Sequence, residues 1–173
     1  MNSPEINIGI TKVHNFWKSG DIKRAEFEIA QLLIRNNDNA LVLTVAADFY
    51  YQFCNMRQAI IYATKAQKCL SVNAPLDEVL YLSKIMCCIG EDEKANDLVH
   101  NYAKGNACTQ NEMAKLADHY LNLDLIEESV ATFNMVDLAE LDDFGLAMFG
   151  TAKLYSGDVQ GAQALFMYAC QKN

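Results

Sequence analysis

The sequence of 173 residues is poor in the residues that interrupt packed structure, with 8 glycines and 2 prolines, and it has no low-complexity segment. It also lacks a run of about 18 to 20 apolar residues that could cross a membrane. Residues 1–8 lack the basic and apolar regions of a secretory signal. Because 51% of the residues are hydrophobic, we expect one folded domain over residues 1–173. The lack of an apolar run and of a secretory signal predicts that the protein is cytoplasmic and is not inserted into a membrane.

Basic residues are also scarce: 14 lysines and arginines stand against 22 acidic residues, for a formal net charge of −8. The basic residues are scattered along the chain, whereas binding to phosphate backbones needs a concentrated basic surface. This composition argues against a nucleic-acid partner. It favours a partner with basic and apolar side chains.

The six cysteines show no Cys-x-x-Cys spacing. A chain of this length with its own core does not need a disulfide framework. We interpret these residues as reduced thiols that pack in the core, rather than as disulfides or metal ligands. The adjacent pair Cys87 and Cys88 has only Lys84 within one helical turn to lower a thiol pKa, which favours a packing role.

Five small residues recur along the chain at spacings of 34, 36, 34 and 33. They are Ala25, Ala59, Ala95, Ser129 and Ala162. A small side chain is expected where two helices of a pair approach most closely. Four residues beyond each of them lies another apolar or small residue, as expected for one face of an amphipathic helix.

Each small residue is preceded by a helix-like segment with a repeated inward face. In the second copy this face is Leu43, Ala46, Ala47 and Tyr50. The first copy departs from the pattern with Gly9 and Lys12, and the fifth with Lys153. Terminal repeats are often atypical because one side faces water.

These patterns resemble the tetratricopeptide repeat family, with about five repeats covering nearly the whole chain. The resemblance implies an all-α fold, a right-handed superhelical solenoid of antiparallel helix pairs. We expect helices over 6–19, 22–36, 40–54, 56–70, 76–89, 92–104, 110–123, 126–137, 143–156 and 159–171. We place Pro75 in the first turn of a helix.

No catalytic constellation accompanies the repeats. His14, His100 and His119 fall in separate copies without metal-ligand spacing, and we interpret them as structural or solvated. The acidic pairs near residues 127 and 142 match helix starts. The sequence therefore predicts a protein that is not an enzyme and that has no cofactor.

The resemblance implies that the first helix of each pair lines a concave groove. One set of positions on these helices is not needed for the core. The set comprises Ile10, His14 and Trp17, then Thr44, Asp48 and Tyr51, then Leu80, Lys84 and Cys87, then Ala114, Asp118 and Leu121, and finally Ala147, Thr151 and Leu154. Trp17, Tyr51, Leu80 and Leu121 are the expected anchors. Packing within the domain is an equally good explanation for Trp17 and Tyr51.

The leading hypothesis is a scaffold or adaptor that binds a protein or peptide segment in this groove. The lysine, arginine and asparagine clamp by which some family members grip chaperone tails is missing, and Asp48 would repel a carboxylate. One alternative is a chaperone of secreted proteins, like those of type III secretion. Another is the amino-terminal interaction module of a larger enzyme. Because the last helix lacks a polar capping helix, a homodimer through this end is also expected.

Overall fold

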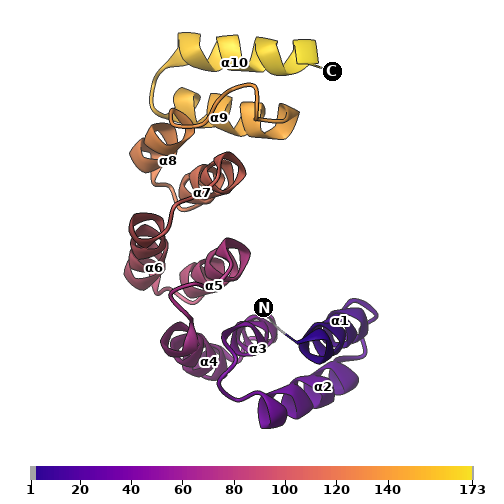
Figure 1. Ribbon diagram of the computed structural model, residues 1–173. Coiled ribbons are helices and arrows are strands. Elements are labelled where there is room, and N and C mark those ends of the chain that lie inside the picture. The colour runs from indigo at the N-terminus through magenta and orange to yellow at the C-terminus, as the bar shows by residue number, and fades with distance from the viewer. Residues whose placement is uncertain (1–2, 173) are drawn as a thin grey trace. The chain divides into compact units, whose positions relative to one another are not determined.

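We analysed a computed structural model, which describes residues 3–172 (Figure 1). These residues form ten α-helices and no strand. The helices are α1 (Pro4–Lys18), α2 (Ile22–Arg35), α3 (Ala40–Gln52), α4 (Met56–Cys69), α5 (Leu76–Cys88), α6 (Asp92–Gly105), α7 (Gln110–Asn122), α8 (Ile126–Phe133), α9 (Asp143–Tyr155) and α10 (Val159–Lys172).

Nine of these helices begin and end within two residues of the predicted ranges, and α8 is the exception. It ends at Phe133 instead of residue 137, so that nine residues, 134–142, connect it to α9. Pro75 is the N-cap residue of α5 and lies one position before the predicted place. Among residues 3–172, no helix combines the length and the apolar character that a membrane span requires.

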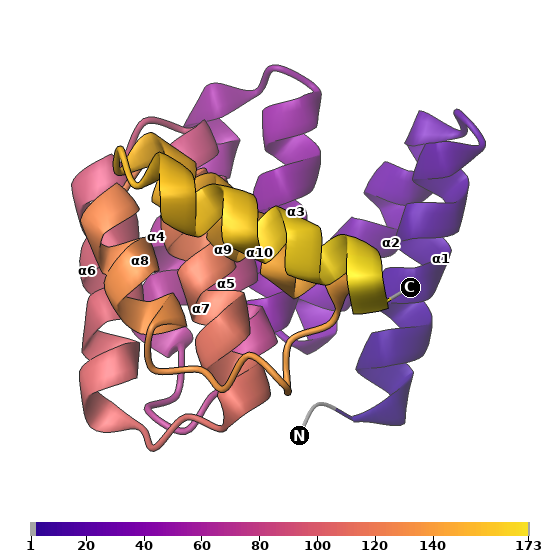
Figure 2. The same ribbon diagram turned by 90° about the horizontal axis from the view of Figure 1, so that it is seen from above.

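The chain forms two compact units, one ending at Leu98 and the other beginning at Val99. In the N-terminal unit α1 pairs with α2 and α3 with α4. In the C-terminal unit α7 pairs with α8, and α10 lies along α9 in both views (Figures 1 and 2). The boundary falls inside α6, and the single domain expected over residues 1–173 stays a prediction.

The two helices of each pair are joined by the same tight turn. In all five turns one residue has a left-handed backbone: Gly20, Cys54, Gly90, Asp124 and Gly157, with φ between 57° and 88°. In the first turn the Gly20 amide donates to the Trp17 carbonyl and the Asp21 amide to the Phe16 carbonyl, at 3.0 and 2.9 Å. The other four turns repeat both bonds, which is the Schellman pattern that ends a helix and reverses the chain.

The prediction that small residues mark the closest approach of paired helices is confirmed. All five are at most 1% exposed. In the α5–α6 pair the Ser83 hydroxyl donates to the Ala95 carbonyl at 3.3 Å, and in the α7–α8 pair the Ser129 hydroxyl donates to the Ala117 carbonyl at 2.8 Å. The helix backbones can approach this closely only because the side chains at the crossing are small.

The atypical positions of the terminal repeats have specific explanations. The repeat pattern places Lys12 on the inward face of α1 with Gly9 and Val13, but Lys12 is exposed, and Ile6 is buried together with Gly9 and Val13. Gly9 allows close packing, because a Cβ atom there would lie 2.5 Å from Leu32 Cδ2 on α2 and the Leu32 side chain would have to move. Lys153 extends 5.6 Å above the Phe149 ring to reach the Asp158 carboxylate at 3.2 Å, so its stem packs while its charge stays paired.

Candidate interaction surface

Within each unit the first helices of the pairs contact one another. In the N-terminal unit α3 contacts both α1 and α5, and in the C-terminal unit α7 contacts α9. The second helices α2 and α4 each contact their partner and the next first helix. The first helices therefore form a continuous layer in each unit, and the predicted binding residues lie on these helices.

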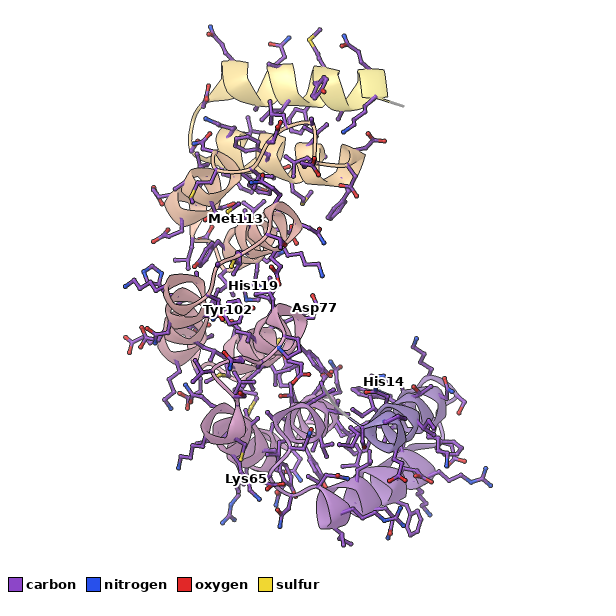
Figure 3. All side chains as sticks on the ribbon, viewed as in Figure 1. His14, Lys65, Asp77, Tyr102, Met113 and His119 are labelled. Atoms are coloured by element: carbon purple, nitrogen blue, oxygen red, sulfur yellow. The ribbon has the colours of Figure 1, made fainter. Side chains whose placement is uncertain are left out.

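Trp17 lies at the contact between α1 and α3. Its ring packs edge-on against Phe49 at 5.7 Å between ring centroids, and against Phe53 at 6.1 Å. His14 projects from the side of α1 opposite α2 (Figure 3), and its ring lies 6.2 Å from that of Trp17. Trp17 is thus partly structural, but it remains only half-buried and can still contact a ligand.

Two predicted residues of α3 have roles within the fold. Thr44 is 2% exposed and its hydroxyl donates to the Ala40 carbonyl at 2.9 Å, so it belongs to the core and cannot line a groove. Asp48 accepts hydrogen bonds from the Tyr81 hydroxyl at 2.6 Å and from the Gln52 amide at 3.3 Å. Asp48 therefore ties α3 to α5 in addition to any contact with a ligand.

The remaining predicted residues of the N-terminal unit stay accessible. Ile10, Tyr51 and Leu80 are half-buried, and Lys84 is exposed. Tyr51 packs at the edge of the core cluster around Leu82, while Ile10 packs at the edge of the cluster around Val13. Ile10 and Tyr51 thus contact the core and also reach the surface, which is the arrangement of a binding anchor with a fixed conformation.

The C-terminal unit contains a cavity of about 260 Å³ between α7, the 134–142 connection and the start of α9. Phe133, Leu141 and Met148 form apolar parts of its wall, and Phe133 and Leu141 are at most 3% exposed. From the predicted set, Ala114 and Asp118 line this cavity, whereas Leu121 packs at the edge of the adjacent core cluster. Burial raises the pKa of Asp118, and a hydrogen bond from the Asn122 side chain partly opposes this shift.

The cysteines are all free, as predicted, and none is fully buried. Cys69 and Cys87 pack against the core cluster around Leu82, so the prediction of core packing is confirmed for these two only. Cys54, Cys88 and Cys170 are exposed, and the other three are half-buried. Burial raises the pKa of the Cys87 thiol to about 11, and the nearby Asp92 carboxylate adds to the increase. Cys87 is therefore protonated at neutral pH and is a weak nucleophile. No group of residues in the described part of the chain could hold a metal ion.

No family model and no curated protein sequence matches the chain. Among solved structures, the nearly identical TPR-like repeats of a kinesin light chain from Podospora anserina match with a TM-score of 0.72 and 15% identity, over 99% of this chain and 96% of that one. The chain has the tetratricopeptide-repeat fold.

Other tetratricopeptide-repeat structures support the same conclusion. YrrB, described as a TPR protein with an unusual peptide-binding site, matches with a TM-score of 0.59 and 13% identity, over 95% of this chain and 84% of that one. MamA matches with a TM-score of 0.61 and 16% identity, over 92% of this chain and 93% of that one. At these identities the comparisons establish the fold, and the sites must be argued from the chain itself.

The tetratricopeptide pattern identified only part of the cavity. Sequence reasoning missed the residues that complete it: Phe133 of α8, Glu140, Leu141 and Asp142 of the connection, and Phe144 and Met148 of α9. The sequence gives no clear signal of this connection, because it arises from the short α8: α9 begins 17 positions after α8 begins, and α3 begins 18 positions after α2 begins. That segment had instead been assigned in part to a longer helix.

A second apolar surface lies on α10. Val159 and Met167 are 60% and 56% exposed, and with Phe166 and Cys170 they line a shallow depression along the helix. The tetratricopeptide stack would place the next helix on this face. The exposed apolar end that was predicted from the sequence is therefore present.

Proposed function

We propose that the chain is a non-catalytic protein-interaction module, a scaffold or adaptor that binds a protein or peptide segment on the layer of first helices. The observation that carries this proposal is that half-buried anchors lie on the layer of first helices in each unit. Ile10, Trp17 and Tyr51 in the N-terminal unit, and Leu121 in the other, contact the core and still reach the surface. Leu80 is half-buried on α5. Such pre-positioned side chains lose little entropy when they bind.

The charge of the chain supports a partner that carries basic and apolar side chains. The net charge is −8, and Asp118 and Asp48 lie on the first helices. Long-range attraction speeds the encounter of such a partner with the chain, and apolar contacts at the anchors supply most of the affinity. A segment that is extended or helical would suit a layer of parallel ridges.

The proposal is tested by selecting binders from a displayed library of random peptides against the full chain. Selected peptides are then measured by fluorescence anisotropy against Tyr51→Ala and Leu121→Ala. We expect at least a tenfold loss of affinity for one of these variants, because truncation of an interface anchor costs about 2 kcal/mol or more. Circular dichroism establishes that each variant is folded.

The matched controls are Ile61→Ala on α4 and Phe27→Ala on α2, which remove exposed apolar side chains from second helices. These controls should keep the affinity of the parent chain. A loss in the controls alone would place the binding surface on the second helices, and equal affinity in all four variants would show that Tyr51 and Leu121 are not anchors. Either outcome would overturn the proposal.

A further inference from the structure

The nine-residue connection between α8 and α9 forms a pocket that the regular repeat would lack. Val136 and Leu141 of the connection are 6% and 3% exposed and are packed into the core of the unit. The Asp137 amide donates to the Gln110 side chain at 2.7 Å, and the Lys172 ammonium donates to the Leu141 carbonyl at 2.6 Å. The connection is thus held in place, and it closes one side of the 260 Å³ cavity.

This pocket has an apolar wall and an acidic rim. Phe133 and Met148 contribute the apolar wall, while Asp118, Glu140 and Asp142 contribute three carboxylates. Lys115 is the one basic residue among the lining residues, so the local charge is three negative groups against one positive, or −2. Such a pocket complements a side chain with an apolar stem and a cationic tip.

The charged form of Asp118 is destabilised in this pocket. Its carboxylate is half-buried on α7, and burial disfavours the ionised form. Asp142 already has one hydrogen-bond partner, because its Oδ1 caps α9 by accepting from the Gly145 amide at 2.7 Å. Glu140 is exposed at the rim. A cation that enters the pocket would relieve the unfavourable burial of the Asp118 charge, and this gives a reason for affinity beyond general attraction.

We propose that this pocket binds a lysine or arginine side chain of the partner peptide. The inference rests on the proposed function, since it names the side chain that the C-terminal unit would recognise. The aliphatic stem of that side chain lies against Phe133 and Met148, and its charged tip lies near Asp118 and Glu140. The pocket thereby selects for a basic residue at one position of the bound segment.

The test uses three blocked amino acids as probes with the full ¹⁵N-labelled chain: N-acetyl-arginine methylamide, N-acetyl-norleucine methylamide and N-acetyl-glutamate methylamide. We expect the arginine probe to shift the amide signals of Asp118, Gly145 and residues 138–142 in a saturable manner. The norleucine probe should bind at least fivefold more weakly, and the glutamate probe should not bind. Added sodium chloride should weaken the binding of the arginine probe, because salt screens its attraction to the carboxylates.

Asp118→Asn and Glu140→Gln are each expected to lower the affinity of the arginine probe about fivefold. This is the effect of losing one partly exposed ion pair of about 1 kcal/mol. Glu127→Gln is the control, because it removes one exposed carboxylate from the same unit outside the pocket. Equal binding of arginine and norleucine, or no saturable shift with either, would overturn the inference.

The outcome separates this inference from the proposed function. If selected peptides bind the chain but replacement of their basic residues by norleucine leaves the affinity unchanged, the pocket inference is wrong and the interaction module stands. If the arginine probe occupies the pocket but no peptide is selected, the pocket stands and the proposed function is wrong.

Discussion

The Ser129 hydroxyl on α8 donates a hydrogen bond to the main-chain carbonyl of Ala117 on α7, at 2.8 Å, and both residues are fully buried. The α5–α6 pair has the same contact in the opposite direction, since Ser83 of the first helix donates to Ala95 of the second. In both pairs the two residues are 12 positions apart. A serine can occupy the tightest point of a pair because its hydroxyl finds a carbonyl on the facing helix.

Substitutions at Ser129 test this arrangement. Ser129→Ala should lower the free energy of unfolding by about 1 kcal/mol through loss of the hydrogen bond. Ser129→Leu should cost more, about 2 to 3 kcal/mol or beyond, because the larger side chain forces α7 and α8 apart. Urea unfolding followed by circular dichroism measures both. Ala131→Leu, at an exposed position of α8, is the control and should have little effect; an equal loss there would contradict the packing argument.

The left-handed turns give a stabilising prediction. Cys54 and Asp124 occupy, at φ of 57° and 60°, the position that glycine fills in the other three turns. An L-residue pays about 1 kcal/mol for this conformation, and glycine does not. Cys54→Gly and Asp124→Gly should therefore each raise the melting temperature by about 2 to 4 °C. Gly90→Ala is the converse variant and should lower it, since a Cβ there meets open space and only the backbone is strained.

The repeat positions, the buried small residues and nine of the ten helices could be predicted because each depends on local pattern. The end of α8 could not. Apolar residues continue past Phe133 with helical spacing, and neither glycine nor proline marks the stop, so the sequence is equally compatible with a longer helix. Only the tertiary structure decides that Val136 and Leu141 enter the core from an irregular segment. The acidic pocket depends on that segment and was missed for the same reason.

The hydrogen bond between Tyr81 and Asp48 could not be predicted from the sequence either. It joins residues 33 positions apart and depends on how two neighbouring first helices align. It gives a prediction about alkaline pH. Burial and the hydrogen bond to Asp48 raise the pKa of Tyr81 above its ordinary value of 10.0. A group with a raised folded-state pKa stabilises the fold below the unfolded pKa, and this contribution is lost as the pH rises above it.

The free energy of unfolding should therefore fall above about pH 10, and the fall should be shallower in Tyr81→Phe. Burial also raises the pKa values of Tyr50 and Tyr120, so part of the fall will persist in the variant. At neutral pH Tyr81→Phe should cost about 1.5 to 3 kcal/mol, because the hydroxyl donates to a charged acceptor. Tyr155→Phe, at a 67% exposed position, is the control. Parallel pH profiles for the parent and Tyr81→Phe would show that this bond has no such role.

Trp17 provides a direct reporter of the N-terminal surface, since it is the single tryptophan of the chain. A peptide that covers the α1–α3 layer should exclude water from its ring and shift its emission to shorter wavelength. A titration with a selected peptide measures this. In the double variant Trp17→Phe/Phe27→Trp the only tryptophan is moved to an exposed position of α2, and its emission should stay unchanged. A peptide that binds without altering Trp17 emission contacts another surface.

The exposed face of α10 predicts self-association. Val159, Phe166, Met167 and Cys170 present apolar surface along one helix, and two copies related by a twofold axis could bury the same face against each other. Light scattering of the parent chain should then give twice the monomer mass of 19.4 kDa. Met167→Glu should give the monomer, because dimerisation would bury an unpaired charge. Met135→Glu changes another exposed methionine of the same unit and should leave the dimer intact. A parent chain that stays monomeric at high concentration would instead leave the α10 face without a second copy to cover it.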